Sequence, residues 1–107
     1  MKASIAAKLG QLSSRFEEVN HLLASEGVTR DLDNYRKLSR EHAEIGPVVE
    51  LYSTYRRTLA DIQSAQDMTA DPEMRELAES EVRQDRERLI ALESELQGLL
   101  LPGMNGE

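Results

Sequence analysis

Apolar residues recur with helical spacing through the first 23 positions of the chain. The steps between them are three or four residues, at Ile5, Leu9, Leu12, Phe16, Val19 and Leu23. This spacing keeps one face of a helix apolar over five turns. Ser4 is placed to cap this helix at its start and Gly27 to end it. Gly10 lies inside the pattern and weakens the helix by up to about 1 kcal/mol.

A second apolar stripe follows a short turn and extends to about Met68. Its members are Leu32, Tyr35, Leu38, His42, Ile45, Val48 or Val49, Tyr52, Tyr55, Leu59 and Ile62. Asp31 is the expected cap, and its charge suits the positive end of the helix dipole. Pro47, preceded by Gly46, removes one backbone donor, so a kink or a brief break is expected there. Because the stripe continues in nearly the same phase, we predict one long bent helix.

The third predicted helix begins with the sequence "ADPEMRELAESEV". Asp71 is the expected cap, and Pro72 fits the first helical position, where its missing N–H has no cost. The apolar stripe of this helix is Met74, Leu77, Val82, Leu89, Leu92, Leu96 and Leu99. Residues 79–88 are poor in apolar side chains, and Asp85 stands where the stripe calls for a leucine. We expect this part to project beyond the bundle or to be solvated on most sides.

Three helices with short connections predict an all-α fold. The expected architecture is an elongated antiparallel three-helix bundle or helical hairpin, with long, coiled-coil-like helices. The third helix is expected to end at Pro102, where "LLLP" passes into a glycine-containing segment. This assigns residues 1–101 to one helical domain and residues 102–107 to the start of a linker.

Composition and charge narrow the possible functions. The chain has no cysteine, which excludes disulfides and cysteine metal sites, and it has no signal-peptide or membrane-length apolar run. A cytoplasmic protein is therefore expected. The net charge is -7, and residues 71–107 hold ten of the 20 acidic residues. An acidic chain argues against free nucleic acid as the ligand and favours a protein partner with a basic surface.

Two histidines and several carboxylate pairs are the first candidates for chemistry. Neither His21 nor His42 has another histidine three or four residues away, as a helical metal site would need. His42 is interpreted as a packed, hydrogen-bonded residue. Paired glutamates occur at four places, namely Glu17 with Glu18, Glu41 with Glu44, Glu76 with Glu79, and Glu93 with Glu95. Glu18 and His21 have the Glu-x-x-His spacing that di-iron bundles use, but these bundles need such a pair on two helices and the sequence has no second one.

These carboxylates are better interpreted as solvated faces and helix ion pairs. Lys37 with Glu41 and Arg40 with Glu44 have the required spacing, and each pair is worth about 0.2–0.5 kcal/mol. The basic groups Arg36-Lys37-Arg40 and Arg56-Arg57 could contact rRNA phosphates, but a mixed helix surface is the favoured interpretation. No serine lies in G-x-S-x-G, and there is no glycine-rich phosphate loop. The sequence therefore predicts no catalytic, cofactor-binding or metal-binding residue.

Three segments together resemble a known family. They are "KLSREHAEIGPVVELYSTYRRTLADIQSAQDM", "DPEMRELAESEV" and the terminal "LLLP". In order and spacing they are similar to the N-terminal domain of the bacterial peptide chain release factor 1 family, the class I release factors. The likeness extends over nearly the whole chain, and each segment is weak when taken alone.

The resemblance implies a role in translation termination at UAA and UAG. In that family a Gly-Gly-Gln loop promotes peptidyl-tRNA hydrolysis and a Pro-x-Thr tripeptide reads the stop codon. This chain has no Gly-Gly pair, and none of its three prolines begins a Pro-x-Thr. The resemblance therefore implies a non-catalytic arm that docks on the ribosome. The implied partners are the stalk-base proteins, the GTPase class II release factor and other domains of the same chain.

A second hypothesis remains open from the sequence. The chain could be a stand-alone helical adaptor or coiled-coil interaction module. It would then self-associate through the apolar stripes of residues 5–23 and 89–99, and a tight dimer would favour it. An enzyme is a distant third possibility.

Overall fold

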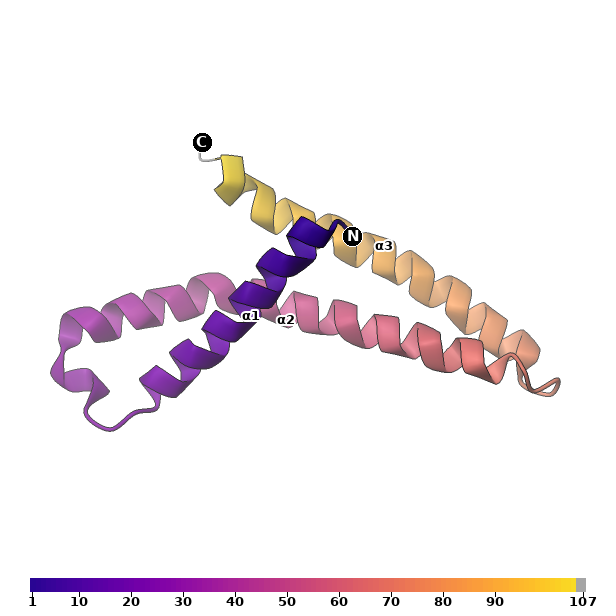
Figure 1. The fold of residues 1–107 in the computed structure, drawn as a ribbon, viewed down its shortest axis with the longest axis horizontal. Helices are drawn as coiled ribbons and strands as arrows, with labels where there is room; N and C mark the ends of the chain where they lie inside the picture. Colours follow the sequence, from indigo (N-terminus) through magenta and orange to yellow (C-terminus); the bar gives the residue numbers. More distant parts are fainter. Residues whose placement is uncertain (106–107) are drawn as a thin grey trace. The chain divides into compact units, whose positions relative to one another are not determined.

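The computed structural model describes residues 1–105, and the side chains of residues 1–100. Its elements are α1 (Ala3–Leu23), the short 3₁₀ helix η1 (Val28–Arg30), α2 (Leu32–Met68) and α3 (Arg75–Asn105), shown in Figure 1. No strand occurs in this described part, so the all-α prediction is confirmed. The chain divides into two compact units, Met1–Glu50 and Leu51–Glu107, with the division inside α2. Unit 1 pairs α1 with the first part of α2, and unit 2 pairs the rest of α2 with α3.

The ends of α1 differ from the prediction. The helix begins at Ala3 after Lys2, which makes no side-chain capping bond, so Ser4 lies inside the helix and is not its cap. The helix ends at Leu23, four residues before Gly27. The Ser25 hydroxyl donates to the Leu22 carbonyl at 2.6 Å and satisfies one of the last carbonyl groups. Gly27, with φ of 82°, serves the turn into η1, which needs a left-handed conformation.

Unit 1 buries the apolar stripe of α1 as predicted. Leu9 and Val19 are buried, and the other four members of the stripe are half-buried. On α2, Leu38 and Val48 are buried, whereas Leu32 in the first turn is 53% exposed, contrary to the prediction. A first-turn residue has no preceding helical turn beside it, so little of the chain covers it. The cap is confirmed, because an Asp31 carboxylate oxygen accepts the Asn34 N–H at 3.1 Å.

Gly46 is explained by the packing of Phe16 from α1. A Cβ at Gly46 would lie 3.3 Å from Cε1 of the Phe16 ring, closer than most such contacts. A glycine is destabilising in a helix, but here it lets the aromatic ring approach the backbone of α2. Gly10, in contrast, has nothing within 4 Å of an added Cβ.

The two glycines make a matched pair of stability variants. Gly10→Ala is expected to raise the free energy of unfolding by about 0.4–1 kcal/mol, because alanine restricts the unfolded chain and favours the helix. Gly46→Ala should gain clearly less, since the Phe16 ring must move to admit the methyl group. Urea unfolding followed by circular dichroism measures both. Equal stabilisation by the two variants would contradict the role assigned to Phe16.

Pro47 does not interrupt α2, which is continuous over 37 residues. The expectation of a brief break is therefore wrong, and the prediction of one long helix is confirmed. Proline fixes φ close to the helical value, so the backbone can pass through it with the loss of one hydrogen bond. The carbonyl that loses its partner belongs to Ala43, an exposed residue that water can reach.

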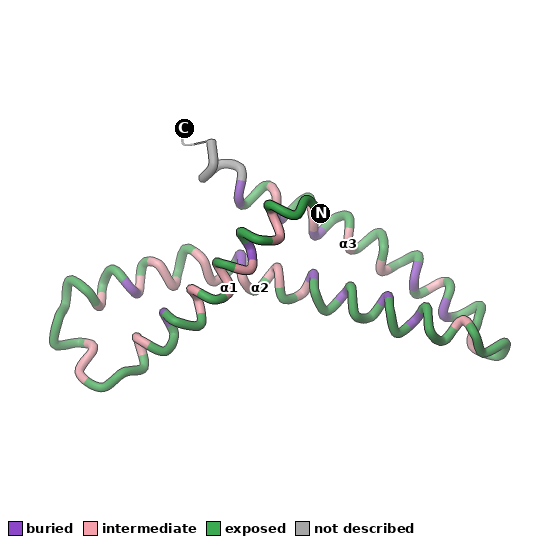
Figure 2. The backbone as a smooth tube through the Cα atoms, in the orientation of Figure 1, coloured by how far each residue is buried: buried purple, intermediate pink, exposed green. Residues whose placement is uncertain are grey.

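Unit 2 is held together by small and branched residues between α2 and α3. Ile62, Ala65 and Val82 form a buried cluster, and Leu89 packs against it. The other buried residues of this unit are Tyr55, Thr58, Ala78, Leu92, Leu96 and Leu100. Buried and exposed residues alternate along both helices, as Figure 2 shows.

Three leucines predicted in the stripes of unit 2 are instead exposed. Leu59 is 43%, Leu77 58% and Leu99 46% exposed. In each case the adjacent residue in the chain is buried instead. These buried residues are Thr58, Ala78 and Leu100. Thr58 and Ala78 are small, so they let the two helices lie close together. The Thr58 hydroxyl is satisfied by donating to the Thr54 carbonyl at 2.9 Å.

The start of α3 is later than predicted, although Asp71 does cap the turn. One carboxylate oxygen of Asp71 accepts the Glu73 N–H at 3.0 Å. The Met74 N–H then donates to the Asp71 carbonyl at 3.0 Å, which closes a tight turn before the regular helix begins at Arg75. Pro72 therefore lies in this turn and is not the first residue of the helix.

The end of α3 is also later than predicted. The helix runs to Asn105 and not to Pro102, again because the φ of proline is compatible with helical backbone. The division into a domain of residues 1–101 and a linker from residue 102 stays a prediction.

Candidate interaction surfaces

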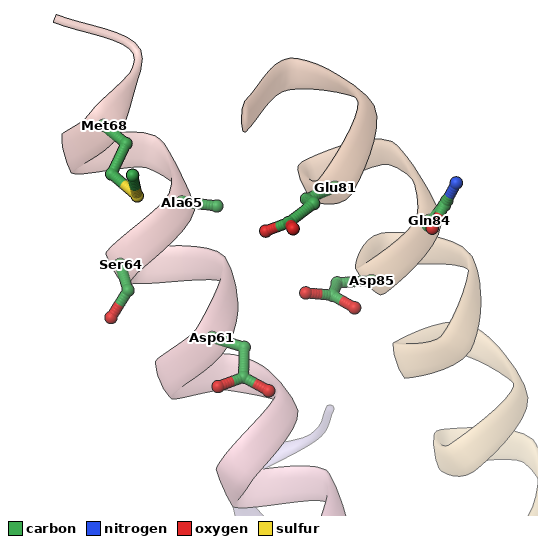
Figure 3. Close-up of a pocket in the computed structure, with 7 residues that line it drawn as sticks. All are labelled: Asp61, Ser64, Ala65, Met68, Glu81, Gln84 and Asp85. Atoms are coloured by element: carbon green, nitrogen blue, oxygen red, sulfur yellow. The ribbon is translucent and has the colours of Figure 1, made fainter. Parts of the chain in front are cut away.

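A hollow lined by carboxylates lies between α2 and α3 in unit 2, and we call it the acidic hollow. It has a volume of about 340 Å³ and is lined by Asp61, Ser64, Ala65, Met68, Glu81, Gln84 and Asp85. Figure 3 shows Glu81 and Asp85 projecting from α3 toward α2, with Asp61 on the facing helix. No lysine or arginine lines it, so its three carboxylates concentrate negative charge.

Of the two alternatives expected for residues 79–88, solvation on most sides is confirmed, because seven of these ten residues are exposed, and projection beyond the bundle is wrong. This part of α3 does not project away, because Val82 packs against Ile62 and Ala65 of α2. Asp85 occupies the stripe position as predicted, and it is half-buried. Its short polar side chain leaves open the space that a leucine would fill.

A second hollow of unit 2 has a different lining, and we call it the arginine hollow. Its volume is about 280 Å³, and its lining residues are Gln66, Thr69, Glu79, Val82, Arg83 and Arg86. Its charged lining residues are two arginines and one glutamate, so the net charge of the lining is positive. The two hollows thus differ in the sign of their charge, which the stripe analysis of the sequence did not indicate.

An ion pair joins α1 to α2 in unit 1. Arg15 Nε donates to one carboxylate oxygen of Glu41 at 2.6 Å, and Nη2 donates to the other at 2.8 Å. Arg15 Nη1 also donates to Glu18 at 2.7 Å. These bonds lower the pKa of Glu41 and raise that of Arg15. Sequence reasoning missed Arg15, and the only available signal was its position next to Phe16 of the apolar stripe.

Neither of the two ion pairs expected within α2 occurs among the described residues. Glu41 is held by Arg15, and Lys37 adds only a weaker electrostatic attraction that also lowers the pKa of Glu41. Within the part of the chain that the structure describes, Arg40 and Glu44 form no ion pair. A planar guanidinium can bind both carboxylate oxygens at once, which an ammonium group cannot do.

The Arg15–Glu41 pair predicts a pH dependence of stability. Because the pKa of Glu41 is lower when folded than when unfolded, the pair stabilises the fold above the unfolded pKa. This contribution is lost as the pH falls through the folded pKa. Glu41→Gln should therefore flatten the acid limb of the unfolding free energy, measured by urea titrations at several pH values below about 5. Glu44→Gln is the control, and an equally flat limb for it would contradict the assignment.

His42 is packed and hydrogen-bonded, as predicted. Its ring lies 4.7 Å from that of Phe16, centroid to centroid, with 34° between the planes. Its Nε2 lies 2.9 Å from Oδ1 of Asn20. His21 is exposed in the last turn of α1, where a basic group suits the helix dipole. Neither arrangement resembles a proton-transfer site.

The basic groups singled out in the sequence lie on the surface. Arg36, Lys37, Arg40, Arg56 and Arg57 are all exposed. The Arg56 guanidinium lies 5.5 Å from the centre of the Tyr52 ring, a cation–π arrangement.

Tyr55 is the buried tyrosine of α2, and it shows no sign of activation. Burial, the charge of Glu93 and Tyr52 together raise the pKa of its hydroxyl. A raised pKa makes the phenolate less accessible near neutral pH.

A metal site and a membrane span are two further possibilities. Among the described residues, no group of three or more histidine, cysteine, aspartate or glutamate side chains is placed to hold a metal ion. No helix in this part of the chain is both long enough and apolar enough to span a membrane.

Comparisons with known proteins agree on one family. A family model described as the PCRF domain matches residues 12–107. The chain is 57% identical over 102 residues to peptide chain release factor 1 of Burkholderia multivorans, covering 95% of this chain and 28% of that protein. The same factor of Burkholderia cenocepacia and that of Burkholderia thailandensis are each 56% identical, with the same coverage.

The chain thus spans about 28% of the length of these relatives. No solved structure matched the chain. The family model covers all but the first eleven residues, including α2, α3 and most of α1. This chain belongs to the PCRF domain family.

Proposed function

We propose that this chain is the ribosome-docking N-terminal domain of a peptide chain release factor 1, acting in termination at UAA and UAG. The observation that carries the proposal is the 57% identity over 95% of the chain to a protein of that name. The domain itself is non-catalytic and cytoplasmic. Hydrolysis and codon reading belong to the Gly-Gly-Gln and Pro-x-Thr motifs of other domains.

The surface chemistry of the chain supports a docking role. The net charge of -7 and the acidic hollow of unit 2 suit a partner with a basic protein surface. Proteins at the base of the ribosomal stalk are the proposed partners, together with the GTPase class II release factor. Ordered helices with charged faces can serve as a rigid arm for such contacts.

The adaptor hypothesis has less support. It requires the stripes of residues 5–23 and 89–99 to be free for a second copy. Leu9, Val19, Leu92 and Leu96 are already buried within the single chain. Exchange of these residues between copies would first require their present contacts to be broken.

A chimera tests the proposed function. The matched 102-residue segment of the Burkholderia multivorans factor is replaced by this chain, and release of formylmethionine is measured on ribosomes programmed with UAA or UAG. The chimera is expected to release the amino acid at both codons, and the chain alone at neither. Release by the chain alone, or a folded chimera that no longer binds ribosomes, would overturn the proposal.

A second test needs only the gene. If the proposal is correct, the reading frame beyond codon 107 continues into Gly-Gly-Gln and Pro-x-Thr motifs. A stop codon directly after Glu107 would instead favour a stand-alone docking module.

A further inference from the structure

Ile90 and Leu59 are two of the large apolar residues of unit 2 that are exposed. Ile90 is 68% and Leu59 is 43% exposed, although the stripe on α2 assigned Leu59 to the core. An exposed isoleucine stabilises a helix poorly, because its branched side chain loses rotamer freedom without gaining burial. Single exposed leucines are common, so the argument depends on where these two residues lie.

Both residues lie on the side of unit 2 where the arginine hollow opens. Gln66 follows Leu59 by seven residues, which is two helical turns, so the two share a face of α2. Arg86 and Arg83 precede Ile90 by four and seven residues and share a face of α3 with it. Gln66, Arg83 and Arg86 line the arginine hollow together. Leu59 and Ile90 therefore lie on the same side of the hairpin as that hollow.

Leu59 and Ile90 also lie at a similar height along the two helices. Ile62, less than one turn after Leu59, belongs to the cluster against which Leu89 packs. Ile90 directly follows Leu89 in the chain. We call the combination of Leu59, Ile90, Arg83 and Arg86 the Leu59–Ile90 surface.

The two guanidinium groups of this surface are opposite in sign to the net charge of the chain. Arg83 and Arg86 are exposed, and in the described part of the chain neither forms an ion pair with a carboxylate. Glu79 is the one carboxylate among the residues lining the hollow. Two unpaired guanidinium groups beside two exposed apolar side chains, on a chain with a net charge of -7, indicate an acidic, partly apolar partner.

We propose that the Leu59–Ile90 surface binds an acidic amphipathic helix of another protein. A helix fits because the groove between two antiparallel helices accepts a third one lying along it. Apolar side chains of the partner would contact Leu59 and Ile90, and its carboxylates would pair with Arg83 and Arg86. The proposal does not depend on the role in termination, and it concerns the side of unit 2 away from the acidic hollow.

A peptide-binding experiment tests this proposal. The probe is a fluorescent 20-residue helical peptide with leucines on one face and glutamates on both flanks of that face, titrated with the chain by anisotropy. Ile90→Ser and Arg86→Glu are each expected to weaken binding about tenfold. Binding should also weaken as the salt concentration rises.

Leu77→Ser is the matched control. Leu77 is another exposed apolar residue of α3, at 58%. It lies four and seven residues before Glu81 and Gln84, which line the acidic hollow, so it belongs to the other side of the hairpin. This variant should bind the peptide as tightly as the unchanged chain. Circular dichroism verifies that all three variants remain folded.

Three outcomes would overturn the proposal. The first is equal binding of a peptide in which lysines replace the glutamates. The second is an equal loss of binding in Leu77→Ser and Ile90→Ser. The third is a concentration-dependent dimer that Ile90→Ser abolishes in sedimentation, because a second copy of this chain would then be the occupant.

Discussion

Leu96→Ala is expected to lower the free energy of unfolding by about 2–5 kcal/mol, the largest stability effect of any variant considered. Leu96 is fully buried, with 0% of its side chain exposed. Truncation to alanine removes the transfer free energy of its buried methyl and methylene groups and leaves a cavity that the neighbouring side chains only partly fill. A domain of this size has a total stability of about 5–15 kcal/mol, so the loss would be a large fraction of it.

Leu99→Ala is the matched control for this prediction. Leu99 lies on the same helix and in the same apolar stripe of the sequence, but it is 46% exposed. Leu99→Ala should therefore lower the free energy of unfolding much less than Leu96→Ala does. Chemical unfolding of both variants, followed by circular dichroism, measures the difference. If the two variants lost similar amounts of stability, the buried face of α3 would not be the one described.

Asp85→Leu is expected to raise the free energy of unfolding by about 1–2 kcal/mol. Asp85 faces α2 at a half-buried position of the stripe and lines the acidic hollow with Asp61 and Glu81. A leucine there would bury apolar area in the hollow and favour the helix. It would also remove one of three neighbouring negative charges.

Gln84→Leu separates the effect of position from the effect of leucine itself. Gln84 lines the same hollow, but it is exposed and its amide points away from α2 in Figure 3. Glutamine and leucine have similar helix propensities, so this variant should change stability by less than about 0.5 kcal/mol. If Asp85→Leu were no more stabilising than Gln84→Leu, Asp85 would not occupy a core position.

The local features of the sequence predicted much of the secondary structure. The stripe of α1 is buried or half-buried throughout, and the carboxylates of Asp31 and Asp71 each accept a backbone N–H. These features depend on residues within a few positions of each other, which the sequence displays directly. The helix ends were less predictable, because Pro72 and Pro102 are compatible with both turns and helices.

The sequence was a poorer guide to which residues of unit 2 are buried. At Thr58 and Leu59 the spacing permitted either residue to face α3, and hydrophobicity favoured the leucine. The structure buries Thr58. The same choice occurs between Leu77 and Ala78 on the opposite helix. Close approach of two helices requires small residues at the contact, and this requirement exists only when both helices are considered together.

The surfaces proposed for binding also depend on pairs of helices. Arg83 and Gln66 lie 17 positions apart and yet line one hollow, while Arg15 reaches Glu41 across 26 positions. By itself the sequence determined three helices, their order, the Asp31 cap of α2 and the acidic charge of the chain, because periodicity and composition are local properties. Only the tertiary structure decided which of two neighbouring residues is buried, which charges meet and which remain unpaired, because these depend on the register and rotation of one helix against another.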